Sequence, residues 1–289
     1  MREKVEYFFV KTFLYLAKVL PSSFLYSFIK GLTLLVYYSD KRRRFITIRN
    51  LSMAYPDKSS KEIKYFSKKV YIELSKTISE ILLMFVNRFD IDNAIINKDE
   101  IIEKLQNLVE NSPQGVIAMT AHFSNWELLA HFLAKHGFPM LVIGRKGNNR
   151  LIEENITTPF RQKYGNGNVY KDKAMLAMVK RLKKGGNVGI LIDQKSGHAN
   201  SVYVNFFGEE VDTTNSIAML KQKLNPLVIP FFIERVERGK YKILILNAIE
   251  SSSENETLKN MTEKYNKVME SVIKNAPEQW FWMHNRWRI

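Results

Sequence analysis

The fold is decided by residues 115–127, which read GVIAMTAHFSNWE. The run from Gly115 to Thr120 is almost entirely apolar and predicts a buried strand. Ser124, with Glu127 three residues later, forms a capping-box pattern, and apolar residues follow it. The segment therefore predicts a strand over 115–120 that leads directly into a helix over 124–136.

The same segment carries a base and a carboxylate, His122 and Glu127. On a continuous helix, residues at this spacing point about 140° apart, so the two side chains meet only if the helix begins between them. A carboxylate that holds an imidazole in one tautomer lets it take a proton from a hydroxyl, as acyl transfer requires. The alternative is structural: Glu127 caps the helix with Ser124, and His122 is an ordinary loop histidine.

Strands and helices alternate along the rest of the chain. We expect strands over 115–120, 139–144, 187–193, 202–206, 227–233 and 241–249. Helices are expected over 41–54, 59–87 (opened by a Ser59–Glu62 capping box), 99–111, 124–136, 149–163, from Asp172 to Gly185, from near Thr213, and over 255–274, with a turn at 164–167. Repeated strand–helix units predict an α/β fold with a mixed, mostly parallel sheet flanked by helices.

The N-terminal region is strongly apolar over residues 5–38, but charges interrupt it. Lys4, Lys11 and Lys18 recur on one helical face, and Pro21 divides the segment. Two amphipathic helices fit this pattern better than one transmembrane helix. We expect residues 1–40 to form a membrane-associated helical segment and 41–289 a catalytic domain with a helical lead-in over 41–112. The alternatives are a span across the bilayer and simple packing on the protein body.

Composition narrows the function. The chain of 289 residues has a hydrophobic content of 45%, which predicts a packed core, and its net charge of +15 favours an anionic partner. The basic cluster at 41–44 suits an anionic membrane surface. No nucleic-acid motif is present, so we expect no nucleic acid as a partner. The absence of cysteine excludes disulfides and a thiol nucleophile. No secretory cleavage pattern is visible, which favours a cytoplasm-facing protein.

Further polar residues follow predicted strands or open helices. Arg145 follows one strand, Asp193 and Gln194 end another, and Thr213–Thr214 begins a helix. In open α/β sheets, ligands bind where strands end and helices begin. Each residue also has a structural explanation: a surface arginine, a turn acid and a helix cap. The histidines show no metal-ligand spacing, so we expect no metal and no cofactor.

Taken together, these motifs resemble the late acyltransferases of bacterial lipid A biosynthesis, within the lysophospholipid acyltransferase superfamily. The resemblance covers nearly the whole chain. It includes Asn50-Leu51 and Pro56, His122-x4-Glu127 with Asn125-Trp126 between, Arg145, Asn148-Asn149 and Arg161, Asp193-Gln194, the run 202–208, Thr213-Thr214 and the closing run 277–287. One departure is Lys146, where many members carry proline.

The resemblance implies transfer of a fatty acyl group from a thioester, usually on acyl carrier protein, to a hydroxyl of a lipid A precursor at the cytoplasmic face of the bacterial inner membrane. His122 and Glu127 would be catalytic, with Glu127 orienting the imidazole. Asp193 would hold an arginine or the acceptor. The expected substrate-binding residues are Asn125, Arg145, Arg161, Asp193, Gln194 and Thr214. The alternatives are another glycolipid acceptor used with acyl-CoA, and an inactive membrane-binding relative.

Overall fold

The computed structural model describes residues 1–170, 173–197, 200–253 and 255–287. Its centre is a six-stranded sheet in the order β3-β2-β4-β1-β7-β8, in which only the β7–β8 pair is antiparallel. The strands are β1 (Val116–Thr120), β2 (Met140–Gly144), β3 (Gly167–Tyr170), β4 (Asn187–Leu191), β7 (Leu227–Glu237) and β8 (Lys240–Ile245). The predicted mixed, mostly parallel sheet flanked by helices is confirmed.

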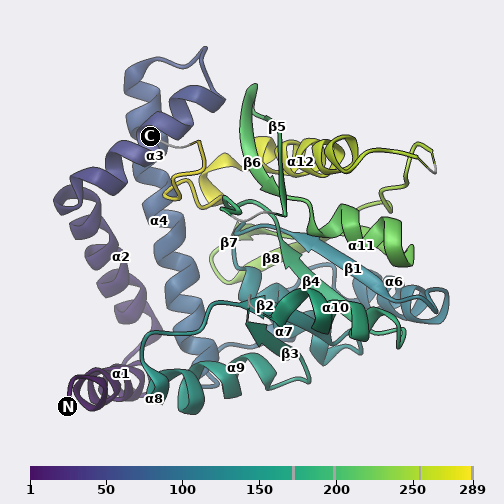
Figure 1. Ribbon diagram of the computed structural model, residues 1–289. Coiled ribbons are helices and arrows are strands. Elements are labelled where there is room, and N and C mark those ends of the chain that lie inside the picture. The colour runs from purple at the N-terminus through teal and green to yellow at the C-terminus, as the bar shows by residue number, and fades with distance from the viewer. Residues whose placement is uncertain (171–172, 198–199, 254, 288–289) are drawn as a thin grey trace.

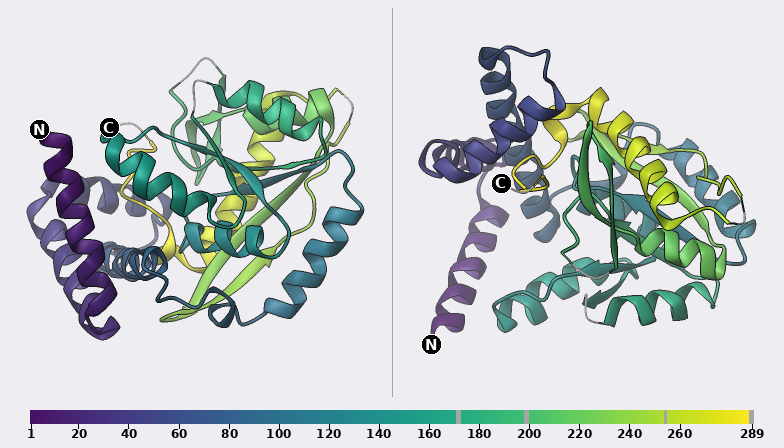
Figure 2. Two further views of the ribbon diagram at one scale, coloured as in Figure 1. Left: turned by 90° about the horizontal axis from the view of Figure 1, so that it is seen from below. Right: turned by 45° about the horizontal axis from the view of Figure 1, so that its top comes forward.

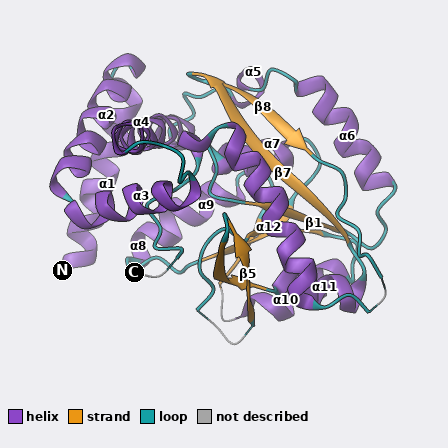
Figure 3. Cartoon of the chain, turned by 90° about the horizontal axis from the view of Figure 1, so that it is seen from above, coloured by secondary structure: helices purple, strands orange, loops and turns teal. Residues whose placement is uncertain are grey.

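Helices cover both faces of the sheet because β1 is apolar on both sides. Ile117 and Met119 pack with one set of helices, and Val116 and Ala118 with the other. Figure 3 shows the two layers on either side of β1 and β7. The first layer contains α10 (Ala174–Leu182), α11 (Ser216–Leu224) and α12 (Leu258–Asn275), and the second α5 (Ile91–Ala94), α6 (Lys98–Glu110) and α7 (Trp126–Lys135).

Four N-terminal helices stand beside this α/β body (Figures 1 and 2). They are α1 (Arg2–Val19), α2 (Ser22–Ser39), α3 (Lys41–Ala54) and α4 (Ser60–Phe85). The Ser59–Glu62 capping box opens α4 as predicted. Buried side chains of α1 and α2 pack on Leu83 of α4. None of the described helices combines the length and the hydropathy needed to cross a bilayer.

The sequence misassigned two short strands. Residues 209–214 form β6 (Glu209–Thr214), which pairs with β5 (Ser201–Phe206) in a separate two-stranded sheet. The predicted helix near Thr213 begins instead at Ser216, because Val211 and Thr213 are buried on the inner side of this hairpin. The predicted turn at 164–167 is followed at once by β3, which had not been expected. The predicted cap Asp172 lies outside the described residues.

The helix predicted over 149–163 contains an irregular turn. α8 (Arg150–Ile152) continues into a π-helical turn, Glu153–Thr157, and then into α9 (Thr158–Gln162). π-Helical turns occur often at functional sites, because the extra residue redirects the side chains that follow. Arg161 lies in α9, four residues after the end of this turn, and lines the cavity described below.

Candidate functional site

Two neighbouring parallel strands bring His122 and Asp193 together. β1 and β4 pair from Ile117–Val188 to Thr120–Leu191, so the residues just after each strand lie side by side. The His122 Nδ1 atom is 2.9 Å from Asp193 Oδ1. The backbone N–H of His122 and the indole N–H of Trp280 both donate to Asp193 Oδ2, at 3.1 and 3.0 Å. Three donors thus hold a carboxylate whose residue is only 2% exposed.

This pairing corrects the predicted one. Glu127 was expected to hold the His122 ring, and Asp193 an arginine or the acceptor; in the structure Asp193 holds the ring and Glu127 pairs with an arginine. Glu127 Oε1 on α7 lies 3.2 Å from a guanidinium nitrogen of Arg161 on α9. Within the described ranges, no hydrogen bond joins Glu127 to His122. The sequence could not indicate this exchange, because it does not specify that β4 lies beside β1.

The turn between β1 and α7 is also built differently from the prediction. Asn125, not Ser124, caps α7: its side chain accepts from the Leu128 N–H at 3.0 Å. Ser124 has a φ of 52°, a left-handed conformation that is uncommon outside glycine. Its N–H donates to the Gln279 carbonyl at 2.7 Å, which ties the turn to the C-terminal run. Asn125 is fully buried, so its predicted contact with substrate does not fit this structure.

The protonation states follow from this geometry. Burial by itself would lower the pKa of His122, but the charge of Asp193 and its hydrogen bond raise that pKa above its ordinary value, with a further contribution from the charge of Glu127. Burial opposes ionisation of Asp193 as well, yet the charge and hydrogen bonds of His122 lower the pKa of that carboxyl. Asp193 is therefore ionised and accepts the Nδ1 proton of His122. The Nε2 atom of the neutral ring is left as the base.

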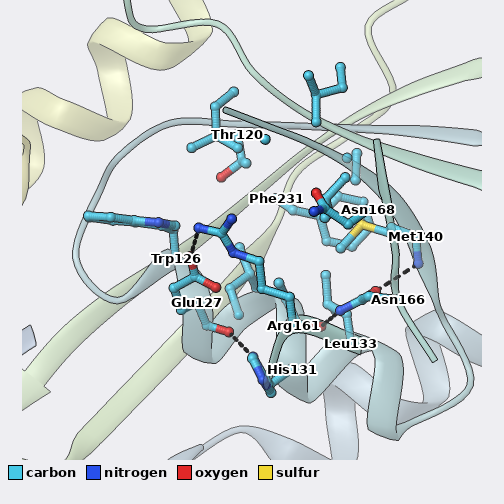
Figure 4. A pocket seen from close by; sticks show the side chains of 18 of the residues that line it. Thr120, Trp126, Glu127, His131, Leu133, Met140, Arg161, Asn166, Asn168 and Phe231 are labelled. Carbon is cyan, nitrogen blue, oxygen red and sulfur yellow. Dashed lines mark hydrogen bonds and ion pairs between the residues drawn. The ribbon is translucent and has the colours of Figure 1, made fainter. Parts of the chain in front are cut away.

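His122 and Glu127 line the same cavity, which has a volume of about 120 Å³. Figure 4 shows Arg161 among the lining side chains, with the ion pair to Glu127 dashed. The cavity lies between α7 and the sheet, and its walls are mainly apolar. They include Ala118, Leu129, Leu133, Met140, Val142, Leu191 and Phe231. The site thus joins a base, an ion pair and a narrow apolar pocket.

A buried histidine joins the two helices that carry this ion pair. The ring nitrogens of His131 lie 2.8 Å from the Glu127 carbonyl and 2.9 Å from the Phe160 carbonyl. Phe160 precedes Arg161, so this contact fixes α9 against α7. Trp126 packs edge-on against His122, with the ring centroids 5.0 Å apart. The structural roles of His131 and Trp280 were not predicted: His131 carries no local pattern that marks it, and Trp280 stood out only as part of the closing run 277–287.

The remaining predicted residues differ in position. Gln194 Nε2 lies 3.5 Å from His122 Nε2, beside the base. Thr214 bonds the Ser216 hydroxyl at 2.7 Å, and Arg145 is exposed in the loop after β2. Among the described residues that line the cavity, neither Arg145 nor Thr214 is included. In the described part of the chain, no group of three acids or histidines is arranged to hold a metal ion.

Comparison with known proteins gives a consistent result. The profile of a family described as "Bacterial lipid A biosynthesis acyltransferase" matches residues 1–289. The lipid A biosynthesis lauroyltransferase of Escherichia coli (strain K12) is 29% identical over 282 residues, covering 95% of this chain and 89% of that protein. The palmitoleoyltransferase of the same strain is 27% identical, with coverage of 86% and 79%. A lipid A biosynthesis acyltransferase of Haemophilus influenzae is 26% identical, with coverage of 86% and 78%.

Proposed function

This chain belongs to the bacterial lipid A biosynthesis acyltransferase family and is an acyltransferase, and we propose that it transfers a fatty acyl chain from acyl carrier protein to a hydroxyl of a lipid A precursor. The product is an ester of the acyloxyacyl type. The observation that carries the proposal is the His122–Asp193 pair at the mouth of an apolar cavity, in a chain that matches this family throughout.

The reaction uses His122 first as a base and then as an acid. Its Nε2 takes the proton of the acceptor hydroxyl, and the oxygen attacks the thioester carbonyl. Asp193 stabilises the imidazolium that forms, through the Nδ1–H bond. As the tetrahedral intermediate collapses, the carbon–sulfur bond breaks, and the imidazolium returns its proton to the departing thiolate. No covalent enzyme intermediate is required.

Arg161 is the cation at the mouth of the cavity and supports the developing negative charge. A guanidinium in such a place stabilises either the oxyanion of the intermediate or a phosphate of the acceptor. Glu127 keeps it in place, because the two side chains form an ion pair at 3.2 Å. In this proposal Glu127 contributes to catalysis in two ways: it holds Arg161 in place, and its charge raises the pKa of His122. Asp193 orients the imidazole.

Glu127→Gln is expected to lower kcat by about 10²–10³-fold, the scale seen when one donor to an oxyanion is lost. The amide keeps the shape of the side chain but no longer anchors Arg161 by charge. Steady-state kinetics on the purified variant measures the effect. Glu154→Gln is the matched control, because Glu154 pairs with Arg150 on the surface of the same helical region and is expected to change kcat less than twofold. Equal activity of the two variants would contradict this role for Glu127.

The donor and acceptor are tested together in one assay. We expect the purified protein to acylate a Kdo-bearing, tetra-acylated lipid A precursor when acyl-(acyl carrier protein) is supplied. The net charge of +15 supports an acidic carrier as the donor. Activity only with acyl-CoA and a phosphoinositide mannoside would favour the alternative acceptor. Absence of transfer with either pair would indicate an inactive relative.

Membrane association is proposed for residues 1–40, with 41–289 as the acyltransferase domain. The first two helices expose many large apolar side chains, next to the basic cluster at 41–44. They include Phe8, Phe9, Tyr15, Leu16, Val19, Phe24, Phe28, Leu32, Leu35 and Val36. An apolar surface beside clustered arginines suits anionic headgroups, as at the cytoplasmic face of a bacterial inner membrane.

The double variant Phe8→Ser/Phe28→Ser is expected to bind anionic vesicles about 10²–10⁴-fold more weakly, because each buried phenyl ring contributes about 1.5–3 kcal/mol. Vesicle co-sedimentation at fixed salt gives the partition coefficient. Tyr203→Ser removes an equally exposed aromatic ring from β5 and serves as the control. Unchanged partition of the double variant would reject this surface as the anchor.

A further inference from the structure

A buried ionic cluster contacts the turn of residues 122–127, which connects β1 to α7. Its centre is Arg235 on β7, whose guanidinium contacts two carboxylates and two hydroxyls. The partners are Glu73 Oε2 at 2.8 Å, Glu80 Oε2 at 3.0 Å, Thr77 Oγ1 at 2.8 Å and the Tyr241 hydroxyl at 2.7 Å. Tyr241 also donates to Glu80, which has no exposed surface. None of these groups lines the apolar cavity.

This cluster holds Ser124 from two sides. The Thr77 hydroxyl donates to the Ser124 carbonyl at 3.2 Å. Gln279, whose carbonyl accepts the Ser124 N–H, uses its side chain to bridge the backbone of Arg235. Its amide oxygen accepts from Arg235 N at 2.7 Å, and its amide nitrogen donates to Arg235 O at 2.9 Å. A positive φ is unfavourable for serine and is kept only where surrounding contacts fix the backbone. These hydrogen bonds fix the backbone of Ser124 at its φ of 52°.

The cluster also reaches the start of α7. Asn125 donates from Nδ2 to Glu80 Oε2 at 3.4 Å, while its Oδ1 caps the helix. The first turn of α7 carries Glu127, and His122 lies three residues before the cap. A buried carboxylate therefore contacts the one side chain that sets where α7 begins.

We propose that Glu80 and Arg235 are positioning residues that hold the 122–127 turn in its reactive geometry. The inference rests on the proposed acyl transfer but concerns residues that do not touch substrate. Replacing a buried ion pair with apolar residues often leaves a protein as stable as before, so stability alone does not account for this cluster. The hydrogen bonds from the cluster to Ser124, Asn125 and Gln279 indicate instead that the cluster positions the turn.

The test compares two contacts of the Glu80 carboxylate: the one with Asn125 of the turn and the one with Tyr26 of α2. Glu80→Gln weakens the link to α7, because a neutral amide oxygen is a poorer acceptor than a carboxylate. Asn125→Ser removes the link, and serine still caps a helix. Each is expected to lower kcat about tenfold to hundredfold, as small misplacements of reacting groups do, with KM for the acyl thioester within about twofold. The double variant should be no slower than the slower single variant. The pH at which kcat/KM rises should move down, since a displaced His122 lies less close to the carboxylates that raise its pKa.

Tyr26→Phe is the matched control. The Tyr26 hydroxyl on α2 donates to the other oxygen of Glu80, Oε1, at 3.2 Å and contacts no residue of the turn. It should change kcat less than about threefold, because the contacts of Glu80 Oε2 with Arg235 and Asn125 stay in place when this hydrogen bond is lost. A loss of kcat in Tyr26→Phe equal to that in Asn125→Ser would overturn the proposal, because it would reflect general loosening.

Folding is separated from positioning by one further variant. Glu80→Gln/Arg235→Met removes both charges of the pair, so no unpaired ion of that pair is left buried. We expect it to fold, by circular dichroism and thermal unfolding, and to remain slow. Wild-type turnover by the folded variants would overturn the positioning role. If the wild type itself fails to acylate the lipid A precursor, the proposed function fails instead, and hydrolysis of the acyl thioester to the free acid serves to compare the variants.

Discussion

His122→Ala is expected to lower the turnover of acyl transfer by about 10²–10⁴-fold, the range usual for a positioned acid–base group. Among the described residues that line the cavity, His131 has both ring nitrogens against carbonyls, and His122 is the imidazole that pairs with a carboxylate. The effect should fall on kcat, because the acyl chain still has its apolar cavity. Single-turnover kinetics with saturating acyl thioester isolates the chemical step.

The protein should remain folded after this substitution. Asp193 keeps the backbone N–H of residue 122 and the indole N–H of Trp280 as donors, so its carboxylate is not left unpaired. Far-ultraviolet circular dichroism and thermal unfolding check this point. A folded His122→Ala variant with nearly normal turnover would show that another group takes the acceptor proton.

Asp193→Asn is expected to lower kcat by a similar factor, about 10²–10⁴-fold, although the residue touches no substrate. A neutral amide no longer stabilises the imidazolium. If its NH₂ group faces the ring, it donates to Nδ1 and moves the ring proton to Nε2, where the base is needed. Rate measurements should show a loss well above that of the exposed control Glu154→Gln.

The pH profile provides a second readout for Asp193→Asn. The base must be unprotonated, so kcat/KM of the wild type rises as pH passes through the pKa of His122. Asp193 raises that pKa above the ordinary value of 6.5. Removal of its charge lowers the pKa, so the rise in kcat/KM should occur at lower pH in the variant, with a reduced plateau. A rise at higher pH than in the wild type would contradict the assignment.

Local patterns predicted most of the fold because they report burial. β1 could be recognised from Val116 to Met119, since a strand buried on both faces is apolar throughout. The α4 helix could be recognised from its Ser59–Glu62 capping box. β6 could not, because residues 209–214 are mostly polar and their burial depends on pairing with β5. β3 is short and contains Gly167 and Asn168, which resemble a turn.

The site was predicted only in part: Asn125, Arg145 and Thr214 do not line the cavity, and the pairing of the charged residues was wrong. His122, Glu127, Arg161 and Gln194 do gather at one place, because strand ends and helix starts of an α/β sheet meet there. Which carboxylate holds the imidazole depends on strand order, and no residue of β1 or β4 specifies that these strands are neighbours. The cap of α7 was misassigned for a related reason, since distant residues, Thr77 of α4 and Gln279 of the C-terminal run, hold Ser124 at a positive φ.

The tautomer of His122 tests the central claim most directly. Nitrogen-15 NMR of histidine-labelled protein, with His122 assigned by loss of its signals in His122→Gln, reports which ring nitrogen carries the proton. Above its pKa, the neutral ring should be protonated at Nδ1, bonded to Asp193, with Nε2 free to accept. A neutral ring protonated at Nε2 would contradict the account, because that imidazole cannot take the proton of the acceptor hydroxyl.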